Sequence, residues 1–437
     1  MTTAEFIHEY REHDTRQLAL QSARFPDVDM PYALDQIKGW QTARRKLPTW
    51  AACDGIVYPP HLSMEQCSSE PTAQYKLNLA MEWARRVQSS ELRVESSSSM
   101  TDLTGGFGVD FSFTSCAFAS ATYVERNEQL CRMVEHNLPL LGIDNAKVVC
   151  ADAIDYLSTL DTQTMIFLDP ARRDQHGAKT VMLADCTPDV VQLLPQLLKK
   201  SRFTMLKLSP MLDWHKAVED LQGTVREVHI VSVGGECKEL LLVLSKEMES
   251  ELRVFCADLE AGGSSLSSGS SSSSCSSHSS EPISPSHPST PSLSASLFVY
   301  APSASRPAPN SKLKTQNSKF LYEPNASIMK AGCFDELAAA YGVSSVSRNS
   351  HLFLAEQPVD GFPGRAFSIE RVTTLNKREL RQALAGIEKA NIATRNFPLS
   401  VAELRKRLKL KDGGDVYIFA TTTAEGEHVL LISRKYQ

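Results

Sequence analysis

A glycine-rich loop at residues 102–110, which reads DLTGGFGVD, constrains the fold of this chain more than any other feature. The loop follows a short apolar run and precedes a stretch whose apolar residues have helical spacing. Glycines at such a junction let the backbone turn sharply and let a ligand approach the main chain, because no Cβ stands in the way. The loop predicts a strand-to-helix turn that is either purely structural or binds a nucleotide.

Carboxylates recur where the successive apolar runs end, at Asp102, Glu125, Asp152 and Asp169. The carboxyl ends of parallel strands meet at one edge of a sheet, and ligands bind at that edge. A carboxylate in the position of Glu125 can accept both hydroxyls of a ribose, and Asp152 can accept from an adenine amino group. The four acids therefore predict a nucleotide-like ligand at this edge.

Short apolar runs alternate with amphipathic stretches from residue 100 to 246, which is typical of a parallel sheet with crossover helices. The expected strands are residues 100–103, 121–124, 147–150, 165–168, 203–208, 225–233 and 239–244. We therefore expect an α/β protein with a Rossmann-like sheet of seven strands. The residues before the first strand, ESSSS at 95–99, are poor material for a buried central strand, so this strand should be short or begin unusually.

A nicotinamide-dependent dehydrogenase would share the glycine loop and Glu125, but two features favour a methyltransferase. Residues 169–173, DPARR, resemble the (D/N)P(P/A)x motif of class I methyltransferases. Residues 228–244 read as two strands joined by a Gly234-Gly235 turn. That hairpin would insert a final antiparallel strand into the sheet, unless it is an ordinary hairpin. We expect a class I methyltransferase sheet with S-adenosyl-L-methionine (SAM) as its cofactor.

Asp169 is the candidate for orienting the acceptor atom or taking its proton, with carbonyl groups presented beside it at Pro170, unless Asp169 only caps the turn. Arg172 and Arg173 carry planar guanidinium groups that suit phosphate or carboxylate, unless they are simply exposed. The DPAR segment also resembles RNA uridine-5-methyltransferases, which use a cysteine after the next strand. Here that strand ends LKLSPM at 206–211, without cysteine. We therefore expect transfer to nitrogen or oxygen.

Polar residues before the glycine loop are expected to fold over the methionine end of the cofactor, or else only to start a helix. These candidates are Glu65, Gln66, Ser68, Thr72 and Lys76. The substrate side of the pocket is expected to be shaped by Arg173, Lys207, Ser209, Glu236, Lys238 and Glu239. The full set of cofactor candidates is Gln66, Ser68, Asp102, Thr104, Gly105, Gly106, Gly108, Glu125, Asp152, Ala153 and Asp169.

Composition divides the chain into four parts. Residues 1–90 read as helices, and residues 91–250 form the SAM-binding domain. Residues 258–318 are dominated by serine and proline and are expected to be disordered, because burial cannot offset the entropy of ordering them. Residues 319–437 alternate strand and helix patterns and form a second, smaller α/β domain. Its basic residues suit phosphate contacts, or else only a solvated helix face. They are Lys377, Arg378, Arg381, Lys389, Arg395, Arg405, Lys406, Arg407, Lys409 and Lys411.

Several classes of protein are excluded. No stretch approaches the roughly 18 uninterrupted apolar residues of a membrane helix, and the polar start MTTAEFIHE does not read as a signal peptide. The ten cysteines contain no C-x-x-C pair and are expected to be reduced thiols in a cytoplasmic protein without a metal site. A net charge of −5 gives no global attraction to nucleic acid, so any such contact must be local.

The chain resembles the bacterial class I SAM-dependent methyltransferase family that carries a C-terminal THUMP-like domain. The resemblance rests on EQCSSE at 65–70, DLTGG at 102–106, DPARR at 169–173, KLSP at 207–210 and LYEP at 321–324. THUMP domains are ferredoxin-like RNA-binding modules of RNA-modifying enzymes, so the resemblance implies RNA, such as transfer RNA, as the substrate. Two alternatives stay open: an RNA-binding protein whose methyltransferase fold is catalytically silent, and a methyltransferase for small molecules or proteins.

Overall fold

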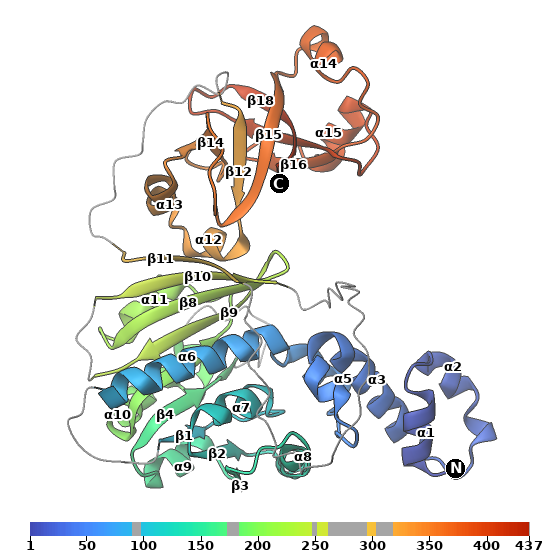
Figure 1. The fold of residues 1–437 in the computed structure, drawn as a ribbon, viewed down its shortest axis with the longest axis vertical. Coiled ribbons are helices and arrows are strands. Elements are labelled where there is room, and N and C mark those ends of the chain that lie inside the picture. The colour runs from blue at the N-terminus through green and yellow to red at the C-terminus, as the bar shows by residue number, and fades with distance from the viewer. Residues whose placement is uncertain (90–97, 173–182, 247–250, 261–294, 303–317, 437) are drawn as a thin grey trace, which may run out of the picture.

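The computed structural model describes residues 1–89, 98–172, 183–246, 251–260, 295–302 and 318–436 of the 437-residue chain. Figure 1 shows a helical N-terminal region, a central sheet flanked by helices, and a second sheet formed by the C-terminal residues. The glycine loop and the four predicted acids belong to the region of the central sheet, and the other two regions pack against it through α6 and α12.

The N-terminal region is helical. Its helices are α1 (Thr3–Tyr10), α2 (Thr15–Leu20), α3 (Met30–Lys46), α4 (Pro48–Ala52), α5 (His61–Gln66) and α6 (Glu70–Ser89), with a 3-10 turn at Ser22–Arg24. The long helix α6 lies along one face of the central sheet (Figure 1). Its buried residues include Ala73, Ala80 and Trp83 and recur every three or four positions, which is the spacing of a helix with one face in the core.

Nine strands of the described chain form the central sheet, in the order β11-β10-β8-β9-β7-β4-β1-β2-β3. Their bounds are β1 (Ser99–Asp102), β2 (Ser120–Glu125), β3 (Ala146–Cys150), β4 (Gln163–Leu168), β7 (Ser201–Leu208), β8 (Val225–Val233), β9 (Glu236–Leu244), β10 (Arg253–Leu259) and β11 (Ala295–Tyr300). The strand β9 is antiparallel to both of its neighbours, β7 and β8. The expected hairpin and antiparallel final strand are therefore confirmed, and β1 is short, as its serine-rich start predicts.

The strands β10 and β11 extend the sheet beyond the seven expected strands. The strand β10 pairs with β8 in parallel, and β11 pairs with β10 in antiparallel fashion. Residues 295–300 lie in the range whose composition predicts disorder, and the structure differs from that prediction there. The physical reason is the short apolar run in β11, which buries Phe298 against the sheet.

Helices connect the strands and cover the sheet. They are α7 (Val109–Thr114), α8 (Glu128–Leu140), α9 (Ala153–Thr159), α10 (Val190–Lys200) and α11 (Trp214–Asp220), with 3-10 turns at Ser115–Ala117 and Leu183–Asp185. A short pair of strands, β5 (Ala171–Arg172) and β6 (Cys186–Thr187), stands apart from the sheet. Apolar residues of the central strands alternate between two cores, as strand geometry requires. Ile166 packs into one core, and Met165 and Phe167 pack into the other.

The C-terminal residues form a second sheet in the order β13-β14-β12-β15-β18-β17-β16 within the described chain. Its elements are β12 (Phe320–Pro324), α12 (Ala326–Ala331), α13 (Phe334–Tyr341), β13 (Ser344–Ser345), β14 (Phe353–Ala355), β15 (Gly364–Thr373), α14 (Lys377–Ala383), β16 (Asn391–Arg395), α15 (Val401–Leu408), β17 (Val416–Thr422) and β18 (His428–Lys435). The alternation of strands and helices follows the pattern read from the sequence, and α14 and α15 share one core with β17 and β18.

The helix α12 joins the C-terminal region to the central sheet, against β8, β9 and β10. Ile328 and Ala331 belong to the same hydrophobic cluster as Val228 and Cys256 of the sheet. Lys330 Nζ donates to the carbonyl of Leu212 at 2.7 Å. A continuous apolar core of this kind holds the two regions in a fixed relation.

Candidate cofactor and substrate site

The glycine loop is tight on one side and open on the other. A Cβ on Gly105 would lie 2.1 Å from Cε2 of Tyr123, so only glycine fits there. Gly106 has φ +54, and a Cβ on it would meet only the carbonyl oxygen of Thr104, at 3.8 Å. Gly108, at φ +82, immediately precedes α7. The loop therefore packs closely against β2 while its other side can receive a ligand.

Three of the predicted acids lie at the carboxyl ends of β1, β2 and β3. Asp102 is 1% exposed and accepts a hydrogen bond from the Thr104 N–H at 2.9 Å. Burial raises the pKa of Asp102 to about 8, although that hydrogen bond opposes the shift. Glu125 accepts from the N–H of Gly106 at 3.1 Å. Asp152 is exposed and caps α9, accepting from the Ile154 N–H at 2.8 Å.

A cavity of about 210 Å³ opens between the glycine loop and the ends of β1, β4 and β7. It is lined by Gln66, Cys67, Ser68, Asp102, Thr104, Gly105, Gly106, Phe107, Gly108, Val109, Asp110, Leu130, Phe167, Asp169 and Lys207. The backbone beside Asp169 is fixed, because its N–H donates to Thr104 Oγ1 at 2.6 Å. Most of the cofactor candidates read from the sequence thus meet at one cavity.

Lys207, on β7, is shared by two carboxylates. Its Nζ lies 2.6 Å from Oδ2 of Asp169 and 2.9 Å from Oδ2 of Asp110. Burial opposes the charge of Lys207, but the carboxylates of Asp110, Asp169 and Glu239 outweigh burial and raise its pKa. Lys207 is therefore a fixed cation at the floor of the cavity.

Lys76, on α6, forms a second, deeper centre of charge. Its Nζ lies 2.6 Å from Glu239 Oε1 and 3.1 Å from Asp110 Oδ1, and it donates to Ser68 Oγ at 3.2 Å. Ser68 in turn donates to Asp110 Oδ2 at 2.8 Å. Burial would raise the pKa of Asp110, but Lys207 and Lys76 outweigh it and lower that pKa. Burial raises the pKa of Glu239, against the opposing effect of Lys76.

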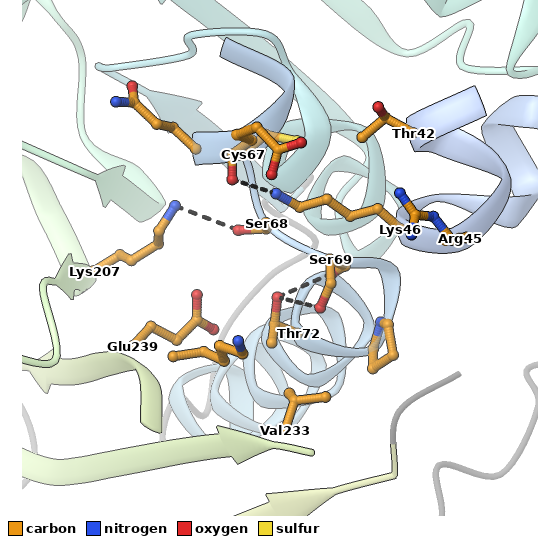
Figure 2. A pocket seen from close by; sticks show the side chains of 14 residues that line it. Thr42, Arg45, Lys46, Cys67, Ser68, Ser69, Thr72, Lys207, Val233 and Glu239 are labelled. Carbon is orange, nitrogen blue, oxygen red and sulfur yellow. Dashed lines mark hydrogen bonds between the residues drawn. The ribbon is translucent and has the colours of Figure 1, made fainter. Parts of the chain in front are cut away.

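A second cavity, of about 480 Å³, adjoins the first (Figure 2). Its lining residues are Thr42, Arg45, Lys46, Glu65, Gln66, Cys67, Ser68, Ser69, Pro71, Thr72, Lys207, Val233, Lys238 and Glu239. In Figure 2, Lys207 and Glu239 enter from the sheet on one side, and Arg45 and Lys46 come from α3 on the other. The two cavities share Gln66, Cys67, Ser68 and Lys207.

The structure brings many, but not all, of the predicted residues to these cavities. Glu125, Asp152 and Ala153 do not line the smaller cavity, although Glu125 accepts from the N–H of Gly106, which does. Ser209, just beyond β7, lines neither cavity, and Glu236 pairs with Lys238 Nζ at 2.5 Å. Pro170 follows β4, and Arg172 lies in β5. The side chain of Arg172, and Arg173 altogether, lie outside the described residues, so their roles stay predictions.

Sequence reasoning missed Asp110, Arg45 and Lys46. Asp110 lies in the first turn of α7, directly after the glycine loop, and its position was the available signal. Its lysine partners come from α6 and β7, which are distant in the sequence. Arg45 and Lys46 end α3, where basic residues are ordinary, so nothing local marks them as parts of a cavity.

Eight of the ten basic residues noted near the C-terminus are exposed on or near α14 and α15. Arg395 and Arg405 are instead partly buried and pair with Glu323 and Asp412.

Over the ranges that the structure describes, no group of three or more His, Cys, Asp or Glu side chains could hold a metal ion. No helix in these ranges is long and apolar enough to cross a membrane.

Comparisons with known proteins identify the domains. Residues 364–435 match the THUMP domain-like family, and residues 320–363 match a ferredoxin-like domain. A “putative methyltransferase” from Porphyromonas gingivalis W83 shares the fold at 29% identity with a TM-score of 0.76, over 100% of this chain and 98% of that chain. The expected methyltransferase sheet with a THUMP-like, ferredoxin-like C-terminal domain is therefore confirmed.

A second solved structure, the SAM-dependent methyltransferase from Agrobacterium tumefaciens, matches at 17% identity with a TM-score of 0.30, over 39% of this chain and 62% of that chain. A sequence comparison with curated proteins gave no match.

Proposed function

We propose that this protein is a SAM-dependent methyltransferase that acts on RNA, at a nitrogen or oxygen atom. The observation that carries the cofactor assignment is the placement of Asp110. This carboxylate lies in the first turn of α7 and lines the smaller cavity, where a Rossmann-like dinucleotide site would hold its pyrophosphate. A carboxylate there disfavours a pyrophosphate. Asp110, Asp169 and Glu239 outnumber by one the two lysines that pair with them, Lys76 and Lys207, and a cluster with net negative charge suits a cofactor with a positively charged sulfur.

The residues present fit this cofactor. The open side of Gly106 leaves room for a ligand against the backbone, since a Cβ there would meet only one atom within 4 Å. Glu125 and Asp152 lie at the ends of the next two strands, where ribose hydroxyls and an adenine amino group would be recognised. SAM, when bound, supplies a methyl group activated by the sulfonium.

Asp169 is the group best placed to orient the acceptor. Lys207 holds its Oδ2, and the Asp169 side chain is 37% exposed, so its other oxygen can reach a substrate. Methylation of a nitrogen or oxygen releases a proton, which a carboxylate or water near Asp169 can take. Lys207 and Thr104 fix Asp169 from both its side chain and its backbone, which favours orientation of the acceptor.

The RNA part of the proposal rests on the C-terminal domain. Its family is THUMP domain-like, its exposed basic residues are gathered around α14 and α15, and α12 fixes it to the central sheet. A protein that resembles this chain over its full length carries the name methyltransferase. The domain family and the exposed basic residues favour RNA over a small molecule or a protein as the substrate.

The cofactor is tested by titrating SAM, S-adenosylhomocysteine and NAD into the purified protein in a calorimeter. We expect SAM to bind, Asp102→Ala to bind it more weakly, and NAD not to bind. Equal affinity of SAM for wild type and Asp102→Ala would overturn the cofactor assignment, as would tighter binding of NAD.

The reaction is tested with SAM that carries a labelled methyl group and total RNA from cells that lack the gene. We expect label in RNA. Asp169→Asn should transfer at least about tenfold less label, because it weakens the positioning of the acceptor; a tenfold loss corresponds to about 1.4 kcal/mol. Binding of SAM and RNA without transfer would instead establish a catalytically silent protein. Transfer only to small molecules or proteins would overturn the RNA substrate.

A further inference from the structure

The larger cavity has the size of a site for one small ligand. Its volume of about 480 Å³ lies within the roughly 300–1,000 Å³ of pockets that enclose small molecules. Its walls come from the end of α3, the end of α5, the segment between α5 and α6, the start of α6, the end of β7, the end of β8 and the start of β9. A base stacked inside a helix cannot reach into a cavity recessed between these elements, but a base turned out of its strand can.

The inner end of this cavity meets the smaller cavity. Gln66, Ser68 and Lys207 line both, so a ligand in one cavity faces a ligand in the other across these side chains. Gln66 offers both a donor and an acceptor, and Thr72 adds a hydroxyl. Such groups match the polar edge of a nucleobase.

The outer end of the cavity carries positive charge. Arg45 is exposed on the last turn of α3. Lys46 Nζ donates to the carbonyls of Met64 at 3.0 Å and Glu65 at 2.6 Å, and carbonyls leave the charge of the ammonium uncompensated. Figure 2 shows Arg45 and Lys46 side by side, opposite Lys207. One acid, Glu65, also lines this rim of the cavity, so Arg45 and Lys46 leave it with a net positive charge that suits an anionic group on the ligand.

The start of α6 also favours an anionic group in this cavity. Ser69, Pro71 and Thr72 line the cavity, so the positive end of a 20-residue helix faces it. Glu70, the acid in the first turn, points elsewhere, since its carboxylate accepts from the N–H and the hydroxyl of Thr49 at 2.9 and 2.8 Å. An anion at this end of the cavity therefore meets little repulsion from α6.

We propose that the larger cavity receives a single nucleotide turned out of the RNA strand, with its base towards Lys207 and its phosphate at the Arg45 rim. This inference rests on the proposed function, and it adds that the N-terminal helices form one wall of the substrate site. Binding energy at the phosphate would position the base for transfer without taking part in it.

Arg44 and Arg45 offer a matched pair of variants. Both end α3 and are exposed, but Arg44 stacks on Trp40 at 5.1 Å and lines neither cavity. Arg45→Ala should raise KM for RNA about tenfold with kcat unchanged, and should reduce the salt dependence of RNA binding by about one phosphate. Arg44→Ala should leave KM and the salt dependence as in wild type, and the melting temperature of each variant checks its folding.

Direct binding uses the four ribonucleoside 5′-monophosphates and the matching nucleosides as probes, titrated into full-length protein saturated with S-adenosylhomocysteine. We expect at least one monophosphate to bind several-fold more tightly than its nucleoside, and Arg45→Ala to abolish that difference. Equal binding of monophosphate and nucleoside would overturn the phosphate contact. A wild-type KM and salt dependence for Arg45→Ala would also overturn it, as would methylation of a peptide instead of RNA.

Failure of the proposed function gives a different result. If SAM does not bind but monophosphate binding still depends on Arg45, the nucleotide site stands and the methyltransferase assignment falls. If RNA is methylated and the two arginine variants behave alike, the methyltransferase assignment stands and the nucleotide site falls.

Discussion

Lys76 Nζ lies 2.6 and 2.7 Å from the two carboxylate oxygens of Glu239, and neither side chain is more than 5% exposed. The pair joins α6 to β9, and through Asp110 it reaches the first turn of α7. A charge pair this deep is costly to desolvate, so its main consequence is geometric: three elements around both cavities are held in one arrangement.

Removal of one partner of this pair should be strongly destabilising. Glu239→Leu leaves the Lys76 ammonium buried with Asp110 as its remaining acid, and we expect a loss of about 3–5 kcal/mol in the free energy of unfolding. The double variant Lys76→Met, Glu239→Leu should lose less than Glu239→Leu alone, because no uncompensated charge is left on Lys76. Urea denaturation measures both, and a double variant less stable than Glu239→Leu would contradict this account.

A control for the pair is Lys216, which forms exposed ion pairs with Glu219 and Asp220. Lys216→Ala should leave the urea midpoint unchanged, since exposed pairs contribute little to stability.

The two adjacent glycines of the loop should respond differently to alanine. Gly105→Ala drives a Cβ into Tyr123, and overpacking of this kind costs roughly 1–3 kcal/mol. Gly106→Ala costs about 1 kcal/mol for its left-handed backbone, but its Cβ points to open space. Thermal melts should therefore rank Gly105→Ala as the less stable variant, and calorimetry should show weaker SAM binding for both. A more stable Gly105→Ala than Gly106→Ala would contradict the packing described for Tyr123.

Asp102 should give the protein a distinctive pH dependence. Burial raises its pKa to about 8, so between about pH 4 and pH 8 the folded protein keeps a proton that the unfolded chain has lost. The folded state then binds more protons, and the free energy of unfolding falls as pH rises through this window, by up to about 1.4 kcal/mol per pH unit from this group. Asp102→Asn should flatten this slope in denaturation curves between pH 5 and 8, and an unchanged slope would refute the assignment.

Glu227 should have the opposite effect to Asp102, because it lowers the free energy of unfolding as pH falls. Burial is outweighed by His229, by Trp83 Nε1 at 2.8 Å and by Arg86 Nη1 at 2.7 Å, so the pKa of Glu227 is lowered to about 2. The contribution of Glu227 to the free energy of unfolding is fully present above its pKa in the unfolded chain, about 4.3, and is lost as pH falls towards 2. The shift corresponds to roughly 3 kcal/mol. Glu227→Gln should remove this part of the acid sensitivity, measured as the midpoint of acid unfolding.

The sequence predicted those parts of the fold whose signals are local. Alternating apolar runs located the strands, and the Gly234-Gly235 turn located the hairpin that sets β9 between β7 and β8. The strand β11 was missed because its short apolar run becomes ordered only by pairing with β10 at the edge of the sheet, where Phe298 is buried. Propensity alone does not report such a partner.

The same limit applies to the site. The glycine loop and Asp169 follow strands directly, so their meeting point could be inferred from the topology of a parallel sheet. Asp110 could not be assigned in this way, because its role comes from Lys76 and Lys207 on other elements. A buried network is a property of the packed structure, and only the charge pattern of its members is written in the sequence.

The basic surface near the C-terminus gives the last prediction. Lys406, Arg407 and Lys409 are exposed at the end of α15, and no ion pair holds them in the described structure. If RNA contacts this surface, replacing all three by alanine should weaken RNA binding and reduce the slope of log affinity against log salt by about two, since each phosphate contact contributes roughly 0.7–0.9. SAM affinity should not change, because these residues line neither cavity. The control is Arg365→Ala, which removes a structural partner of Glu323 and should lower stability without changing the salt slope. A triple variant that methylates its substrate with wild-type KM and salt dependence would remove RNA from the proposed function and favour a small-molecule or protein substrate.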